Sequence, residues 1–109
     1  MARERVIVEI QNLDQALKVE ETIRTGYCDP IAENLLAWIA VEEDLIDSYE
    51  KLSEKFAGNQ EVKKAIDSLY EESRNNIKMI RNILDSVEEL GAARDRRRDI
   101  LRRLIESNR

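Results

Sequence analysis

A single acidic residue, Glu42, interrupts an otherwise apolar series in the middle of the sequence. Between Pro30 and Ala57, apolar residues recur every three or four positions, and Glu42 stands where another is expected. The apolar positions of this series are Ile31, Leu35, Trp38, Leu45, Tyr49, Leu52 and Phe56. A carboxylate in an apolar interior is costly unless it is paired, hydrogen-bonded or bound to a cation. Glu42 is therefore a candidate for a cation site or for a structural polar layer.

A second series with the same spacing begins at Asn59 and ends at Leu90. Its members are Val62, Ile66, Leu69, Ser73, Asn76, Ile80, Ile83, Val87 and Leu90. If the chain turns back at Gly58, residues at equal height have numbers that add up to about 116, because both helices rise equally per residue. Polar residues then lie opposite Glu42. We predict a polar core layer with Arg74 or Arg81 as counter-charge, formed by Glu42, Ser73, Asn75 and Asn76.

The chain contains no histidine and one cysteine, Cys28. The absence of histidine excludes Ser-His-Asp triads, Cys-His dyads and imidazole zinc sites. One cysteine forms neither an internal disulfide nor a thiolate metal cage, which fits a reducing compartment. We identify no catalytic or cofactor-binding residue, and the composition favours a protein that is not an enzyme.

The helical pattern is broken only at a few residues, and these divide the chain. Gly26, the pair Asp29 and Pro30, the pair Gly58 and Asn59, and Gly91 separate long periodic stretches. Asp29 and Asn59 are expected to cap helices, and Gly58 to end one in a left-handed conformation. We predict one domain, 1–109, with helices at 4–25, 30–57, 60–90 and 92–107. A strand over residues 6–10, paired between two chains, is the alternative at the amino terminus.

The residues around Glu42 and its opposite positions resemble the ferritin-like superfamily, in particular rubrerythrin-like domains, over about residues 30–90. The resemblance lies in the segment 40–43 (Ala-Val-Glu-Glu) with Tyr49 one heptad after Glu42, and in the segment 70–75 (Tyr-Glu-Glu-Ser-Arg-Asn). It implies Glu42 and Glu72 as metal ligands. Asn75 stands where the family has histidine, so the resemblance implies an incomplete di-iron site.

Two copies of the chain would bring two such helix pairs together. Their carboxylates, two of Glu42 and two of Glu72, could then hold Fe, Mn, Mg or Ca. Otherwise no cofactor is expected. The protein is thus predicted to be all-α, an antiparallel helical bundle with a long ferritin-like hairpin and shorter terminal helices, completed by dimerisation into a homodimer or higher homo-oligomer.

Charge is unevenly distributed along the chain. Residues 91–109 carry seven arginines against three acids, whereas residues 1–90 carry 11 Lys and Arg against 20 Asp and Glu. This arginine-rich segment either lies on acidic groups of its own or a second chain, or binds a nucleic acid or another anion. The candidate anion patch consists of Arg94, Arg96, Arg97, Arg98, Arg102 and Arg103.

The function expected first is that of a ferritin-like helical protein without an intact di-iron site that acts by self-association or by binding a protein partner. The alternatives are a metal-binding or oxidoreductase protein and a nucleic-acid-binding or anion-binding protein. No segment reaches the roughly 20 apolar residues of a membrane span, and no signal-peptide core is found. We therefore expect a cytoplasmic protein with no membrane partner.

Overall fold

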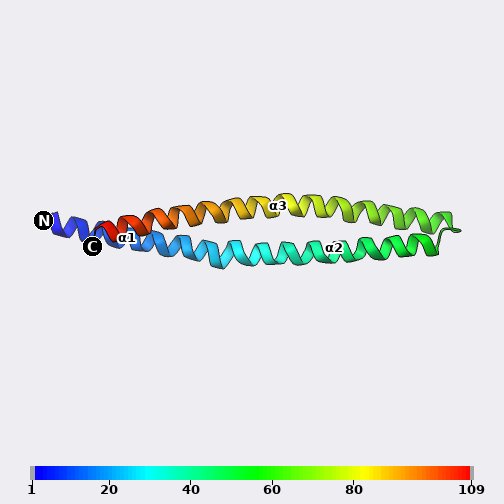
Figure 1. The fold of residues 1–109 in the computed structure, drawn as a ribbon, viewed down its shortest axis with the longest axis horizontal. Helices are drawn as coiled ribbons and strands as arrows, with labels where there is room; N and C mark the ends of the chain where they lie inside the picture. Colours follow the sequence, from blue (N-terminus) through cyan, green and yellow to red (C-terminus); the bar gives the residue numbers. More distant parts are fainter. Residues whose placement is uncertain (1, 109) are drawn as a thin grey trace. The chain divides into compact units, whose positions relative to one another are not determined.

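The computed structural model describes the backbone of residues 2–108 and the side chains of residues 9–108. Helix α1 covers Ala2–Ile23, a π-helical turn η1 covers Arg24–Cys28, α2 covers Asp29–Lys55 and α3 covers Gln60–Ser107 (Figure 1). No strand occurs in the described backbone, so the all-α prediction is confirmed. The alternative of a strand at residues 6–10 is wrong, because these residues belong to α1.

The chain divides into two compact units. The first, which we call the hairpin unit, contains residues 33–86. The second, which we call the terminal unit, contains residues 1–32 and 87–109.

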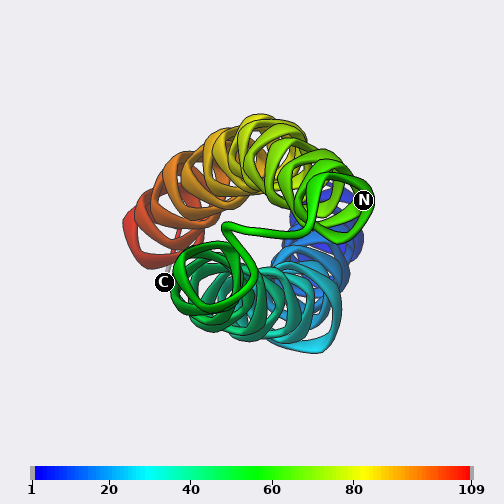
Figure 2. The same cartoon turned by 90° about the vertical axis from the view of Figure 1, so that its right-hand side faces the viewer.

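In the hairpin unit, a short turn connects α2 to α3 (Figure 2). The Asn59 N–H donates to the Phe56 carbonyl at 2.9 Å, and the Asn59 side chain accepts a hydrogen bond from the Val62 N–H at 3.2 Å. Asn59 is therefore the predicted cap of α3. Gly58 has no positive φ, so the expected left-handed conformation is wrong.

Contacts between the two helices of the hairpin unit show that they run in opposite directions. Glu50 contacts Tyr70, and Glu42, which lies earlier on α2, contacts Asn76, which lies later on α3. The buried apolar side chains of this unit are Leu35, Ile39, Ile66, Ile80 and Leu84. Buried with them are Glu42 and Ser73. The polar residues thus lie within the apolar core.

The sequence-based core is wrong for part of each helix. Trp38, Leu45 and Leu52 are exposed, whereas Ile39, absent from the predicted series, is buried. On α3, Leu69 and Ile83 are likewise exposed. The reason is that each helix carries two adjacent apolar stripes, and a spacing of three and four residues can be followed from one stripe into the other. Only one stripe on each helix faces the neighbouring helix.

The predicted helix boundary at Gly91 is wrong, whereas at Gly26 the α-helix does end but a π-helical turn joins it to the next α-helix. Gly91 lies inside α3, which continues to Ser107, so the separate helix 92–107 does not exist. A glycine costs only about 1 kcal/mol in a helix interior, which its helix-forming neighbours can offset. At the other boundary, Asp29 has helical φ and ψ and its N–H donates to the Arg24 carbonyl, so Asp29 is not an N-cap.

The π-helical turn explains how the chain remains helical before Pro30. Proline lacks an N–H, and its ring clashes with the carbonyl four residues earlier, which here belongs to Gly26. A wider turn relieves such a clash and adds one residue to the helix. Consistent with the added residue, the buried side chains of Glu20 and Cys28 are eight residues apart instead of seven.

Candidate functional site

The predicted polar layer of the hairpin unit exists and is centred on Glu42. The Glu42 side chain is only 8% exposed. Its Oε1 accepts hydrogen bonds from the indole Nε1 of Trp38 at 3.2 Å and from Nδ2 of Asn76 at 3.4 Å. The hydroxyl of buried Ser73 on α3 also interacts with this carboxyl group. The layer therefore surrounds a buried carboxylate with uncharged donors from both helices.

These donors stabilise the ionised form of Glu42. The interaction with Ser73 contributes most to lowering the pKa of Glu42, and the hydrogen bonds from Trp38 and Asn76 lower it further. Burial alone would raise the pKa, but the three donors outweigh it. The second oxygen, Oε2, is buried and accepts no hydrogen bond of standard length. The hydrogen bonds from Trp38 and Asn76 are thus both on Oε1.

The other residues predicted around Glu42 lie elsewhere. Asn75 is exposed, so it is not part of the buried layer. Arg81, a predicted counter-charge for Glu42, forms its ion pair with the exposed Glu43 at 3.2 Å. The Arg74 guanidinium lies 5.7 Å from the centre of the Tyr70 ring on its own helix. Neither arginine has an ion pair with Glu42 among the described side chains.

The two predicted metal ligands are placed differently. Glu42 is buried between the helices, whereas Glu72 is exposed. Among the side chains of residues 9–108, no group of three or more His, Cys, Asp or Glu residues could hold a metal ion. At this level of the hairpin unit, a single chain therefore offers one buried carboxylate, that of Glu42, with amide, hydroxyl and indole neighbours. This donor set does not fit a di-iron centre.

Trp38 has a role in the layer that the sequence analysis missed. Its place in the apolar series predicts packing, but its indole N–H donates to Glu42, and the residue as a whole is 50% exposed. The signal in the sequence was the spacing of four residues between Trp38 and Glu42, which places both on one side of a helix. A buried indole or carboxylate requires a polar partner, and these two residues partly satisfy each other.

Trp38 and Asn76 also mark one side of the hairpin unit. They come from different helices and bind the same oxygen, so both side chains lie on the same side of the helix pair. Residues seven positions before or after these two lie on the same side of each helix, because seven residues make about two turns. We call this surface the outer face; it consists of Trp38, Leu45 and Leu52 on α2 and of Leu69, Asn76 and Ile83 on α3.

The outer face is almost free of charge. The positions three residues after the outer-face residues border this face. Four of them are uncharged and exposed: Val41, Ser48, Met79 and Ser86. The charged residues at this spacing are Lys55 and Glu72, one of each sign. The opposite side of the helix pair differs, because it contains the ion pair between Glu43 and Arg81 and the contact between Glu50 and Tyr70. The side opposite the outer face thus carries more charged side chains than the outer face does.

An open hollow of about 470 Å³ lies near the turn of the hairpin unit. Two tyrosines line it, Tyr49 and Tyr70, together with side chains of both charges. The Tyr70 hydroxyl donates to Glu50 at 3.3 Å, so this phenol already has a polar partner. Both tyrosines are half-buried, as expected for residues at the core boundary.

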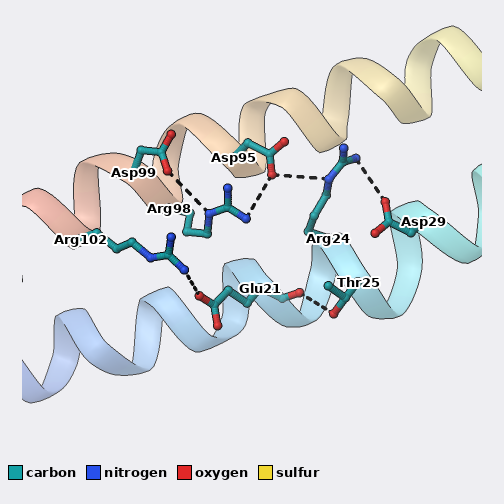
Figure 3. Close-up of polar contacts among 8 residues, drawn as sticks. All are labelled: Glu21, Arg24, Thr25, Asp29, Asp95, Arg98, Asp99 and Arg102. Carbon is teal, nitrogen blue, oxygen red and sulfur yellow. Dashed lines mark hydrogen bonds and ion pairs between the residues drawn. The ribbon is translucent and has the colours of Figure 1, made fainter.

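In the terminal unit, the arginines of α3 bind acidic residues of the same chain. Glu20 is only 4% exposed and is paired with Arg94 at 3.2 Å and Arg97 at 3.3 Å. Arg102 binds Glu21 at 2.8 Å (Figure 3). These ion pairs connect α1 to the last part of α3.

A second group of ion pairs surrounds the π-helical turn (Figure 3). The Arg24 guanidinium lies 3.6 Å from Asp29 and 3.4 Å from Asp95. Arg98 lies 3.6 Å from Asp95. The Arg24 guanidinium also occupies the space into which a side chain at Gly91 would extend. The missing side chain of Gly91 therefore makes room for Arg24 inside the unit.

The predicted anion patch is consequently divided. Arg94, Arg97, Arg98 and Arg102 form ion pairs within the terminal unit. Arg96 and Arg103 are exposed and have no ion pair among the described side chains. Much of the positive charge of this segment is thus neutralised locally, which leaves less of it to bind a polyanion.

Comparison of the chain with protein-family models, with curated proteins and with solved structures gives no match. Within the described residues, no helix is both long and apolar enough to span a membrane.

Proposed function

We propose that the protein acts by self-association: two copies bury their outer faces against each other and form a four-helix arrangement of the ferritin-like type without an intact di-iron site. The observation that carries this proposal is the outer face itself, an exposed apolar surface on both helices of the hairpin unit. The role is that of a structural or interaction protein, not that of an enzyme.

Each helix of the hairpin unit has enough apolar surface to pack against two other helices, but within the unit it packs against only one. Each outer-face residue directly precedes a residue that points toward the other helix, as Trp38 precedes Ile39 and Ile83 precedes Leu84. Helices that pack against two neighbours in a bundle carry this broader apolar stripe, whereas a two-stranded coiled coil needs only the narrow one. The hairpin unit uses one stripe and leaves the other exposed to solvent.

A second copy of the chain is the partner that matches this surface best. The face offers few charged groups, so it suits neither a nucleic acid nor an acidic membrane surface, and it is complementary to another uncharged apolar face. Its exposed apolar side chains would bury on the order of 500 Å² per copy. With their uncharged neighbours, they approach the roughly 800 Å² per partner of a standard interface. An isologous dimer uses this one surface twice.

Paired substitutions test the proposal. Leu45→Lys places a charge in the middle of the outer face, and Leu36→Lys makes the same change at a residue that is 54% exposed on the other side of α2. We expect sedimentation velocity to show dissociation at micromolar concentration for Leu45→Lys and an unchanged dimer for Leu36→Lys. Equal behaviour of the two variants would overturn the proposal, because burial at Leu45 alone distinguishes them.

A further inference from the structure

Asn76 is the polar member of the outer face and lies at its middle. Since Glu50 contacts Tyr70 and Glu42 contacts Asn76, residues at equal height can be matched across the hairpin unit. Leu45 lies level with Asn76. The neighbouring levels are both apolar. One contains Leu52 and Leu69, and the other contains Trp38 and Ile83.

The Asn76 side chain is held in place but is not fully hydrogen-bonded. Its Nδ2 donates to Glu42 Oε1 at 3.4 Å, which fixes the amide relative to a buried carboxylate. Its Oδ1 accepts no hydrogen bond from the described residues, and the amide can donate one more. The residue is half-buried within a single chain. Covering the outer face would bury this amide and require a partner for it.

Two-fold symmetry provides such a partner. Two identical faces can meet so that each helix packs against the same helix of the other copy, running in the opposite direction. The two-fold axis then lies between the faces at the height of Leu45 and Asn76 and exchanges the levels above and below it. Each Ile83 then meets the other copy's Leu69. The residue next to the axis meets its own equivalent, and an asparagine amide can both donate to and accept from a second asparagine.

We propose, on the basis of the self-association above, that Asn76 pairs with Asn76 of a second copy and thereby sets the register and the number of chains. A buried asparagine at one position of a helical interface disfavours every alignment in which its amide lacks a partner. Glu42 orients the amide for this contact. The layer of Glu42, Trp38 and Asn76 therefore determines specificity at the interface.

Cysteine cross-linking tests this contact in the full-length chain. In a Cys28→Ser background, Asn76→Cys places a thiol at the proposed axis, and Asn75→Cys makes the same change at the adjacent exposed amide. Under mild oxidation, we expect Asn76→Cys to form the covalent dimer more than about tenfold faster, because the interface holds the two thiols at a high effective concentration. Equal rates in a protein that sediments as a dimer would overturn the asparagine pairing and leave self-association intact. A wild-type monomer would overturn both proposals.

Asn76→Leu provides a second test that does not depend on cross-linking. Removing the amide should remove the penalty on other alignments, so the single dimer should be replaced by several species in sedimentation velocity. One dimeric species with unchanged cross-linking between Leu69→Cys and Ile83→Cys chains would contradict the proposal. If Asn76→Cys lost its helical circular dichroism, the Asn76→Leu result would decide.

Discussion

The amide of Asn76 on α3 lies 3.4 Å from Oε1 of Glu42 on α2 and joins the two helices through a buried anion. This contact combines a core residue with a residue of the outer face. Glu42 should therefore affect both the stability of the hairpin unit and the position of Asn76 on the surface proposed for association.

Replacement of Glu42 should alter stability in a pH-dependent way. Because the pKa of Glu42 is lowered in the folded protein, its contribution is complete above the ordinary carboxyl pKa of about 4.3 and is lost as pH falls through the lowered value. We expect Glu42→Gln to reduce the free energy of unfolding by about 1–2 kcal/mol at neutral pH and by much less at low pH. Urea denaturation at several pH values and one protein concentration measures this.

The matched control for this experiment is Glu43→Gln. Glu43 is exposed and its ion pair with Arg81 is solvated, so a change below about 1 kcal/mol is expected. A destabilisation by Glu42→Gln that stayed constant from neutral to acid pH would show that the carboxylate charge has no special stabilisation in the folded protein.

The buried Glu20 predicts unequal roles for neighbouring arginines. Arg94→Ala removes a partner of this nearly inaccessible carboxylate, whereas Arg96 is exposed and forms no ion pair among the described side chains. We expect Arg94→Ala to cost about 2–3 kcal/mol, with Arg97 retaining part of the interaction, and Arg96→Ala to cost below about 0.5 kcal/mol. Urea midpoints at constant protein concentration compare them, and similar midpoints would mean that the Glu20 pair is not important for stability.

Gly91 and Arg24 should be energetically coupled. In an Arg24→Ala background, Gly91→Ala should stabilise the protein by about 1 kcal/mol because alanine is the better helix former. With Arg24 present, the new methyl group displaces the guanidinium from Asp29 and Asp95, and most of that gain should disappear. A double-mutant cycle measured by thermal denaturation tests this; the same effect of Gly91→Ala in both backgrounds would exclude the coupling.

Local neutralisation of the arginines predicts weak binding to polyanions. We expect the wild-type protein to elute from heparin at low salt, and the variant with Arg96→Ser and Arg103→Ser to elute slightly earlier, because these residues have no ion pair among the described side chains. Strong retention at physiological salt that disappears in this variant would instead favour the nucleic-acid or anion-binding alternative.

Much of the helical content could be predicted from the sequence, because three glycines and one proline leave long uninterrupted periodic stretches. The position of the turn at Gly58 and the cap at Asn59 followed from local chemistry. A polar layer of Glu42, Ser73, Asn75 and Asn76 was also predicted, since breaks in two apolar series coincide at one height. Three of these residues lie together, whereas Asn75 is exposed.

The remaining features depend on packing that local patterns do not encode. The choice between two adjacent apolar stripes follows from the facing helix, so Ile39 and Trp38 could not be distinguished by spacing alone. The absence of a side chain at Gly91 makes room for Arg24, which lies far earlier in the chain, so this contact could not be predicted from the residues around Gly91. The π-helical turn before Pro30 accommodates the proline ring within a continuous helical backbone, whereas the sequence pattern predicts that the helix is interrupted there.

The central claim is that the outer face is covered by a second copy of the chain. Sedimentation equilibrium of the wild-type protein at several micromolar concentrations tests it most directly. A molar mass of twice 12.7 kDa is predicted, with association lost in Leu45→Lys and retained in Leu36→Lys. A mass of 12.7 kDa at every concentration would contradict the account.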